Sequence, residues 1–153
     1  VQVLGEPTLE LPPDPGPAGD ETIEGVDVND NGIRDDIERW IGLNFRDSEK
    51  TRMALTQLYY PLQSFMIHAR ENDRDAVYND MDAMQRANEC LKYVRPDDAY
   101  KIGKELHARV VNTTDRSYAF RDSSRMLGGG SFPRVPRSKW IDSCIFNPDI
   151  LEN

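Results

Sequence analysis

The stretch SEKTRMALTQLYYPLQSFMIHA, residues 48–69, carries a clear helical pattern. Apolar residues recur in it every three or four positions, which places them on one face of an α-helix. That face comprises Leu55, Leu58, Tyr59, Leu62, Phe65, Met66 and Ala69. Ser48 suits the N-cap, and Glu49 lies near the positive end of the helix dipole. Because proline lacks a backbone N–H, we expect Pro61 to kink or divide this helix.

The same spacing predicts further helices on both sides of this stretch. One helix precedes it and ends near residue 46, a third follows an Asp73 cap, and Pro96 suits the first turn of a fourth. Their apolar faces are Ile33, Ile37, Trp40 and Ile41, then Val77, Met81, Met84, Leu91 and Val94, then Ala99, Ile102, Leu106, Val110, Thr113 and Phe120. No segment alternates polar and apolar residues long enough for a good strand. We therefore predict an all-α fold, a small helical bundle of about four helices.

Irregular segments flank the predicted bundle. Residues 1–25 hold Pro7, Pro12, Pro13, Pro15 and Pro17, half of the ten prolines, and predict an extended, acidic, Pro-rich N-terminal arm or linker. Residues 26–153 form the predicted helical domain. The glycine run 128–130 ends its helices and leads into an irregular C-terminal tail. The expected anchors of this tail are Trp140, Ile141, Ile145 and Phe146.

Composition excludes two classes of protein. The chain has 153 residues, enough for one domain with a real core, and no run approaches the roughly 18 apolar residues of a membrane span. Its formal charge of −8 and pI near 4.8 argue against a nucleic-acid partner. Residues 1–50 contain thirteen acids and four bases, whereas residues 51–153 contain fourteen acids and fifteen bases. The net negative charge therefore comes from the first third of the chain.

Part of that acidity follows a metal-binding pattern. Residues 27–38 read DVNDNGIRDDIE and fill every position of the calcium-loop template D-x-[DN]-x-[DN]-G-x5-E. Calcium takes six to eight oxygen ligands, so the chain must wrap around the ion, and Gly32 permits the sharp turn. The predicted Ca²⁺ ligands are Asp27, Asn29, Asn31, the Ile33 carbonyl, Asp35 directly or through water, and Glu38. The alternative is a polar turn that leads into a helix with an acidic first turn.

Two features distinguish this loop from a paired EF-hand. A Pro-rich approach replaces the incoming helix, and Arg34 occupies the eighth position, where paired loops carry an aliphatic residue. The loop therefore resembles the single-sided calcium motifs of thrombospondin type 3 repeats and dockerin modules. This resemblance covers about fifteen residues and implies a metal site in an extracellular or surface protein. An unpaired loop of this kind is expected to bind with a dissociation constant of about 10⁻⁴–10⁻³ M.

The two cysteines, Cys90 and Cys144, suggest the same environment. An even count fits one disulfide, which would attach the tail to the third predicted helix in an oxidising compartment. The alternative is a pair of reduced, buried thiols. No CxxC or Cys/His cluster indicates zinc.

Signatures of other chemistry are weak. His68 and His107 lie on different predicted helices and form no HExxH or triad motif. Arg134, Arg137 and Lys139 form a basic patch in the tail that could meet an anionic partner, although packing of the tail on the helices is the simpler interpretation.

The sequence thus favours a non-enzymatic, calcium-binding domain with structural calcium and a protein partner at the cell envelope. We expect an extracytoplasmic location: periplasmic, anchored at the outer membrane, or secreted. The chain starts at Val1 rather than Met, so we expect that an upstream signal or lipid anchor has been removed. The alternatives are a periplasmic immunity or inhibitor protein and a secreted hydrolase with a dispersed site.

Overall fold

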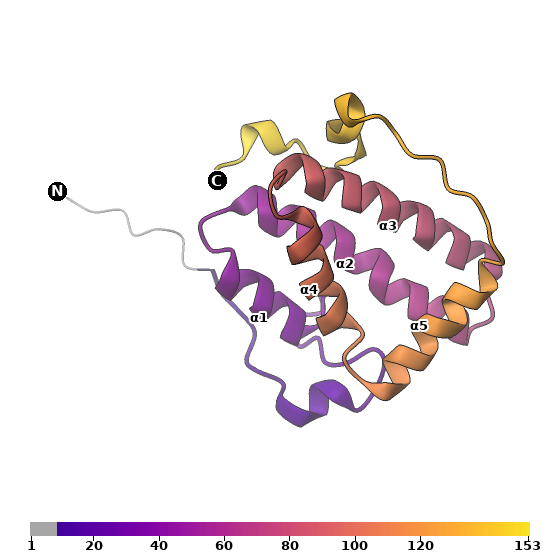
Figure 1. The fold of residues 1–153 in the computed structure, drawn as a ribbon. Coiled ribbons are helices and arrows are strands. Elements are labelled where there is room, and N and C mark those ends of the chain that lie inside the picture. Colours follow the sequence, from indigo (N-terminus) through magenta and orange to yellow (C-terminus); the bar gives the residue numbers. More distant parts are fainter. Residues whose placement is uncertain (1–8) are drawn as a thin grey trace.

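The computed structural model describes residues 9–153, and within them it is all-α, which confirms the predicted fold class. The α-helices are α1 (Asp35–Asn44), α2 (Glu49–Arg70), α3 (Arg74–Val94), α4 (Ala99–Val110) and α5 (Thr114–Met126). Short 3-10 helices cover Gly16–Asp20, Arg137–Ser143 and Pro148–Ile150. The long helices α2 and α3 lie side by side and antiparallel, and the shorter helices pack around them (Figure 1). No described helix has the length and apolarity that crossing a membrane requires.

Local side-chain caps set where the helices begin. The Ser48 hydroxyl accepts the Thr51 amide N–H at 3.3 Å, and the Asp73 carboxylate accepts the Ala76 amide N–H at 3.0 Å. Both caps were expected from the sequence. Each one satisfies a backbone donor that has no partner within its helix.

The prediction of one long fourth helix is wrong. The helix ends at Val110, and Thr113 caps a separate helix, α5, by accepting the Arg116 amide N–H at 3.2 Å. An apolar stripe continues through the break, and this continuity made the two helices appear as one in the sequence. Pro61 does not divide α2, which runs from Glu49 to Arg70.

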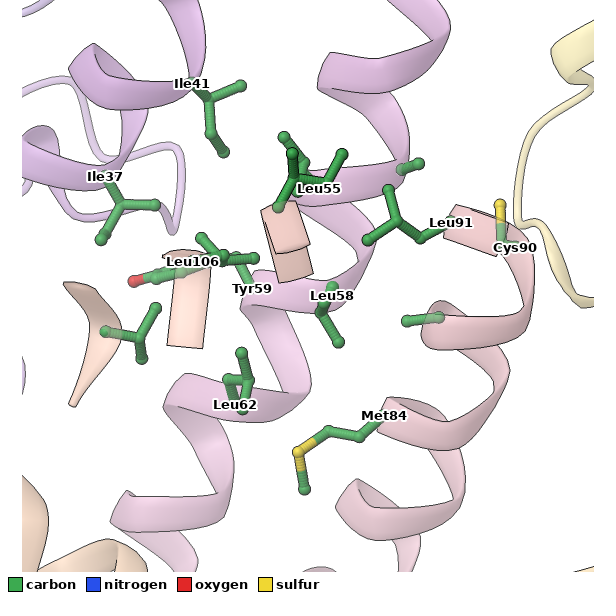
Figure 2. Packing of buried hydrophobic residues seen from close by; sticks show 14 of the residues in the cluster. Ile37, Ile41, Leu55, Leu58, Tyr59, Leu62, Met84, Cys90, Leu91 and Leu106 are labelled. Atoms are coloured by element: carbon green, nitrogen blue, oxygen red, sulfur yellow. The ribbon is translucent and has the colours of Figure 1, made fainter. Parts of the chain in front are cut away.

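The core is centred on α2. Leu55, Tyr59, Phe65 and Met66 are buried in the middle of the bundle, because α2 contacts all four other helices. Figure 2 shows α2 leucines facing Leu91 and Met84 of α3. Burial of these side chains is the main favourable contribution to folding.

The C-terminal tail is fastened to the bundle by polar groups as well as by a covalent bond. A disulfide joins Cys90 of α3 to Cys144. The buried Gln57 amide donates to the Ser143 carbonyl at 2.8 Å and accepts the Ile145 amide N–H at 3.1 Å. The buried Glu89 carboxylate accepts the Ser143 hydroxyl at 2.8 Å. Ile145, an expected apolar anchor, is instead 76% exposed.

The described part of the Pro-rich arm, residues 9–25, lies against the helical domain (Figure 1). The Arg39 guanidinium donates to the Pro12 carbonyl at 2.8 Å, and Leu11 rests on Gly42 of α1, where a side chain would clash. Arg70 pairs with Glu24 and lowers the pKa of that carboxyl. The segment is irregular apart from the 3-10 helix Gly16–Asp20, and the sequence did not indicate its contacts with the helices. Residues 1–8, including Pro7, lie outside the described residues.

Removal of the disulfide should cost much of the stability of the protein. The bond closes a sequence separation of 54 residues, so the chain-entropy relation predicts that a Cys90→Ala/Cys144→Ala variant loses about 4 kcal/mol of unfolding free energy. Urea denaturation monitored by circular dichroism would measure this loss. A variant as stable as the parent protein would contradict the prediction.

Candidate metal centre

The predicted calcium loop, residues 27–38, leads directly into α1. Two residues have a left-handed backbone, Asp30 at φ 55° and Gly32 at φ 82°. Glycine adopts this conformation without strain, and aspartate tolerates it better than most residues do. These two residues reverse the direction of the chain between Asp27 and α1. Gly32 is the sixth residue of the loop, where the calcium template requires a sharp turn.

Asp27 holds the loop in this shape. One oxygen of its carboxylate accepts the Asn31 amide N–H at 3.2 Å, and the other accepts the Gly32 amide N–H at 2.8 Å. The Asn31 side-chain oxygen in turn accepts the Ile33 amide N–H at 2.9 Å. The first template residue therefore organises the backbone of the loop.

Three predicted ligands meet at one point. The side-chain amides of Asn29 and Asn31 donate to the same Glu38 oxygen, Oε2, at 3.3 and 3.0 Å. Glu38 lies in the first turn of α1, so this point is at the positive end of the helix dipole. The structure thus brings Asn29, Asn31 and Glu38 together.

Asp35 has a different role from these residues. It is buried, and its two carboxylate oxygens accept the Val28 amide N–H at 3.2 and 3.3 Å. Its own backbone N–H donates to the Val26 carbonyl at 2.8 Å. Within residues 9–153, no group of three or more His, Cys, Asp or Glu side chains is placed to hold a metal ion. The three predicted carboxylate ligands, Asp27, Asp35 and Glu38, are therefore not gathered into such a group, and the other predicted oxygens belong to Asn29, Asn31 and the Ile33 carbonyl.

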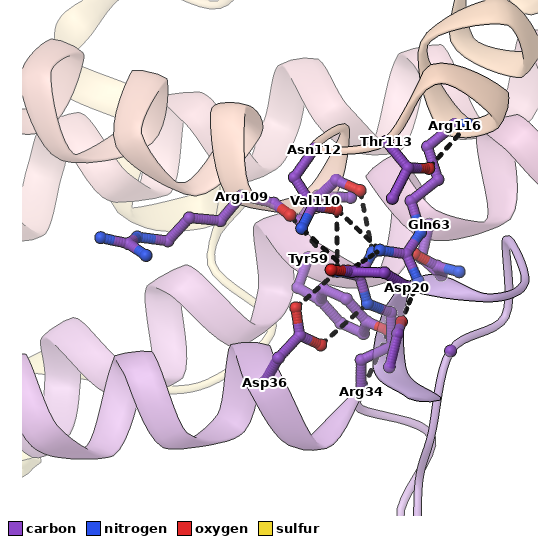
Figure 3. Close-up of polar contacts among 12 residues, drawn as sticks. Asp20, Arg34, Asp36, Tyr59, Gln63, Arg109, Val110, Asn112, Thr113 and Arg116 are labelled. Carbon is purple, nitrogen blue, oxygen red and sulfur yellow. Dashed lines mark hydrogen bonds and ion pairs between the residues drawn. The ribbon is translucent and has the colours of Figure 1, made fainter. Parts of the chain in front are cut away.

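The loop is fixed to the bundle by Arg34, which is 1% exposed. Its guanidinium forms a two-point ion pair with Asp36, with Nε–Oδ1 and Nη2–Oδ2 distances of 3.0 and 2.6 Å. It also donates to the carbonyls of Val110 and Arg109 at 2.8 and 3.3 Å. These carbonyls end α4, where the helix dipole is negative, so the cation is well placed there. Figure 3 shows this arrangement.

A second buried cation, Arg116 of α5, binds the arm beside Arg34 (Figure 3). Its guanidinium donates to the carbonyls of Gly19, Thr22 and Ile23 at 2.6, 2.8 and 3.3 Å. The Asn112 side-chain oxygen accepts from both guanidinium groups, at 3.5 Å from Arg34 and 2.6 Å from Arg116. Burial, together with the nearby charge of Arg34, lowers the pKa of Arg116. The arm, the loop and the start of α5 therefore meet at one polar cluster.

Tyrosines of α2 complete the support of the loop. The buried Tyr59 hydroxyl accepts the Arg34 backbone N–H at 3.0 Å. The Tyr60 hydroxyl donates to the Asn31 carbonyl at 3.1 Å, and the Tyr60 ring lies close to Gly32. A Cβ at position 32 would approach that ring to 3.3 Å, a second reason for glycine there.

The two histidines lie away from this loop. The Asp80 carboxylate accepts a hydrogen bond from the Ser64 hydroxyl at 2.8 Å and contacts His68 Nδ1 at 2.5 Å. These two contacts join α2 to α3. In a nucleophilic triad the imidazole stands between hydroxyl and carboxylate, whereas here the carboxylate stands between the other two. His107 packs edge-on against Phe120 with ring centroids 4.7 Å apart, and burial lowers its pKa. The Ser64–Asp80–His68 arrangement therefore does not place an imidazole to activate the serine.

Loss of the Arg34 charge should destabilise the whole fold. An Arg34→Met variant leaves the Val110 carbonyl and Asp36 without their cation, and we expect a loss of about 3–5 kcal/mol in unfolding free energy. The matched control is Arg86→Met, because Arg86 is 64% exposed and pairs with Asp82, which is 46% exposed. That change should cost less than about 1 kcal/mol. Equal losses in chemical denaturation would contradict the role of Arg34.

Burial of Tyr59 predicts a loss of stability at high pH. Burial raises the pKa of Tyr59 from 10.0 to about 12. A group whose pKa is raised on folding contributes stability that is present in full below the unfolded value and is lost as pH rises through the folded value. Ultraviolet absorbance should therefore show one tyrosine ionising near pH 12, together with unfolding. The Tyr59→Phe variant should lack this ionisation step. If the step persists in the variant, it belongs to another residue.

Comparison of the chain with protein-family models, curated proteins and solved structures gives no match.

Proposed function

We propose that residues 27–38 bind one calcium ion and that the chain is a calcium-stabilised, non-enzymatic binding module of an extracytoplasmic compartment. The observation that carries this proposal is the meeting of Asn29 and Asn31 at the Glu38 carboxylate, inside a loop closed by Asp27. Calcium needs this kind of site, in which oxygen-bearing side chains from alternate positions surround one point.

The chemistry of these side chains suits a cation. Both asparagine amides turn their N–H groups toward Glu38, and a half-turn of each amide would bring its oxygen to the same place. An ion there would receive oxygens from Asn29, Asn31 and both arms of Glu38. Asp27 and the Ile33 carbonyl would add ligands, and Asp35 would contribute through water.

Charge favours occupancy by a divalent ion. The loop contains five acids and one base, a net charge of −4. The single base, Arg34, is paired with Asp36 and lies in the protein interior, so it does not neutralise the carboxylates of Asp27, Asp30 and Glu38. Calcium would reduce the mutual repulsion of these carboxylates.

The compartment is inferred from affinity and from the disulfide. A single loop of about 10⁻⁴–10⁻³ M affinity is filled at millimolar calcium outside a cell and is almost empty in cytosol. The Cys90–Cys144 disulfide is stable in the same oxidising surroundings. Calcium would then be structural, holding the arm and α1 in place beneath a helical surface that contacts a partner at the cell envelope.

Calorimetric titration of calcium into chelator-treated protein should show one site with a dissociation constant of about 10⁻⁴–10⁻³ M. Asp27→Ala and Glu38→Gln should each abolish the heat of calcium binding. Asp27→Ala removes the residue that closes the loop, and Glu38→Gln removes the carboxylate at its centre. At 1 mM calcium, bound ion should raise the unfolding free energy by about 0.4–1.4 kcal/mol.

Asp30→Asn is the matched control. Asp30 belongs to the same loop and carries the same charge, but it is not a predicted ligand, and asparagine also tolerates its left-handed backbone. The calcium affinity of the Asp30→Asn variant should remain within a few-fold of that of the parent protein. If Asp30→Asn weakens binding as much as Glu38→Gln does, the attraction is only a general effect of charge. The absence of heat in the parent protein would reject the site.

A further inference from the structure

A groove with no assigned role separates α3 from α4. These helices are joined by residues 95–98 and diverge from that link, and α2 passes beneath them (Figure 1). The groove has a volume of about 480 Å³, which is within the range of small-molecule sites. None of its lining residues belongs to the loop 27–38 or to the arm.

The floor of the groove is apolar. Leu58 and Leu62 of α2 lie at its base, and Ala99 of α4 forms part of one wall. The α3 wall combines the apolar Met81 with the polar Gln85 and Asn88. Gly103 of α4 adds no side chain to this space, and a Cβ there would make ordinary contacts with Leu91, Asn88 and Leu58 at 3.4, 3.7 and 3.8 Å. An alkyl chain placed in this groove would leave water for apolar surroundings.

The rim, in contrast, is cationic. Lys92 of α3, Lys104 of α4 and Arg134 of the tail all line the groove and are exposed. Within residues 9–153, none of these three cations forms an ion pair. The groove also contains one carboxylate, Glu89, but this group is buried and already accepts the Ser143 hydroxyl and the Val135 amide N–H. Unpaired positive charge therefore surrounds the apolar floor, in a protein whose net charge is −8.

Another residue that lines the groove, His107, adds little positive charge near neutral pH. Its ring is half-buried against Phe120, and burial lowers its pKa. The ring thus extends the apolar wall, and the charge of the groove comes from its two lysines and one arginine.

We propose that this groove binds an amphipathic organic anion: a linear alkyl chain on the α2 floor with its carboxylate at the rim beside Lys104 and Arg134. The apolar floor requires an apolar body, and the unpaired cations require a negative head. The volume favours a small molecule over a segment of another protein. This proposal does not depend on calcium binding, because it uses none of the loop residues.

Decanoate is a suitable probe, used below its micellar concentration and in chelator so that no calcium salt forms. Trp140 lies near the groove, with the Lys92 ammonium 5.5 Å from its ring, and should report binding by fluorescence. Calorimetry would give the affinity. Lys104→Gln and Arg134→Gln should each weaken binding about tenfold, the effect of losing one charge-assisted contact. Gly103→Met should fill the groove and abolish binding.

Lys101→Gln is the matched control, because Lys101 is exposed on the same helix but does not line the groove. Lys101→Gln should leave the affinity for decanoate unchanged. Asp27→Ala should leave it unchanged too, and this result would show that decanoate binding does not depend on the calcium site. Decyltrimethylammonium has the same chain with a positive head and should not bind. Binding of both amphiphiles, equal effects of Lys101→Gln and Lys104→Gln, or binding of an acidic peptide but not of decanoate would overturn the proposal. Circular dichroism would check that the Gly103→Met variant folds.

Discussion

The structure depends on one buried positive charge. Transfer of a guanidinium out of water is costly, and the cost is recovered only where ion-pair and hydrogen-bond partners are complete. Arg34 has such partners in Asp36 and in the carbonyls at the end of α4. The chain must therefore bring residue 34 to residues 109–112, segments that are about half its length apart. This requirement fixes the start of α1 against the end of α4.

The same cluster connects the candidate metal loop to the rest of the molecule. Arg34 lies between Asn31 and Glu38 in sequence, and its side chain is buried. A change in the loop backbone would therefore also displace the buried Arg34 guanidinium. Arg116, through the shared Asn112, extends the cluster to the arm. An ion in the loop would reinforce a conformation that two buried cations already impose. This coupling is a reason to regard calcium as structural, since the loop has little freedom to transmit a large rearrangement.

Helix positions could be predicted from sequence because local physics determines them. The stripe from Leu55 to Ala69 and the caps at Ser48 and Asp73 use only neighbouring residues, and the structure reproduces them. The break before Thr113 was missed because an apolar stripe can continue across two helices that bury the same side. The roles of Arg34 and Arg116 were missed for a different reason: their partners lie tens of residues away. The one available signal was Arg34 at the eighth loop position, where an aliphatic residue would normally stand.

The fastening of both terminal segments follows from the size of the core. Five helices, four of them packed around α2, form the main hydrophobic cluster, and the arm and the tail add only partly buried apolar residues at its edge, among them Ile23 and Phe146. Polar and covalent contacts therefore help to hold both segments. The tail is held by a disulfide and by two buried polar side chains, Gln57 and Glu89. The arm has no cysteine and is held by guanidinium groups on its carbonyls. Backbone carbonyls carry no sequence information, which explains how a segment rich in proline, with few N–H groups to donate, can still be bound at a defined place.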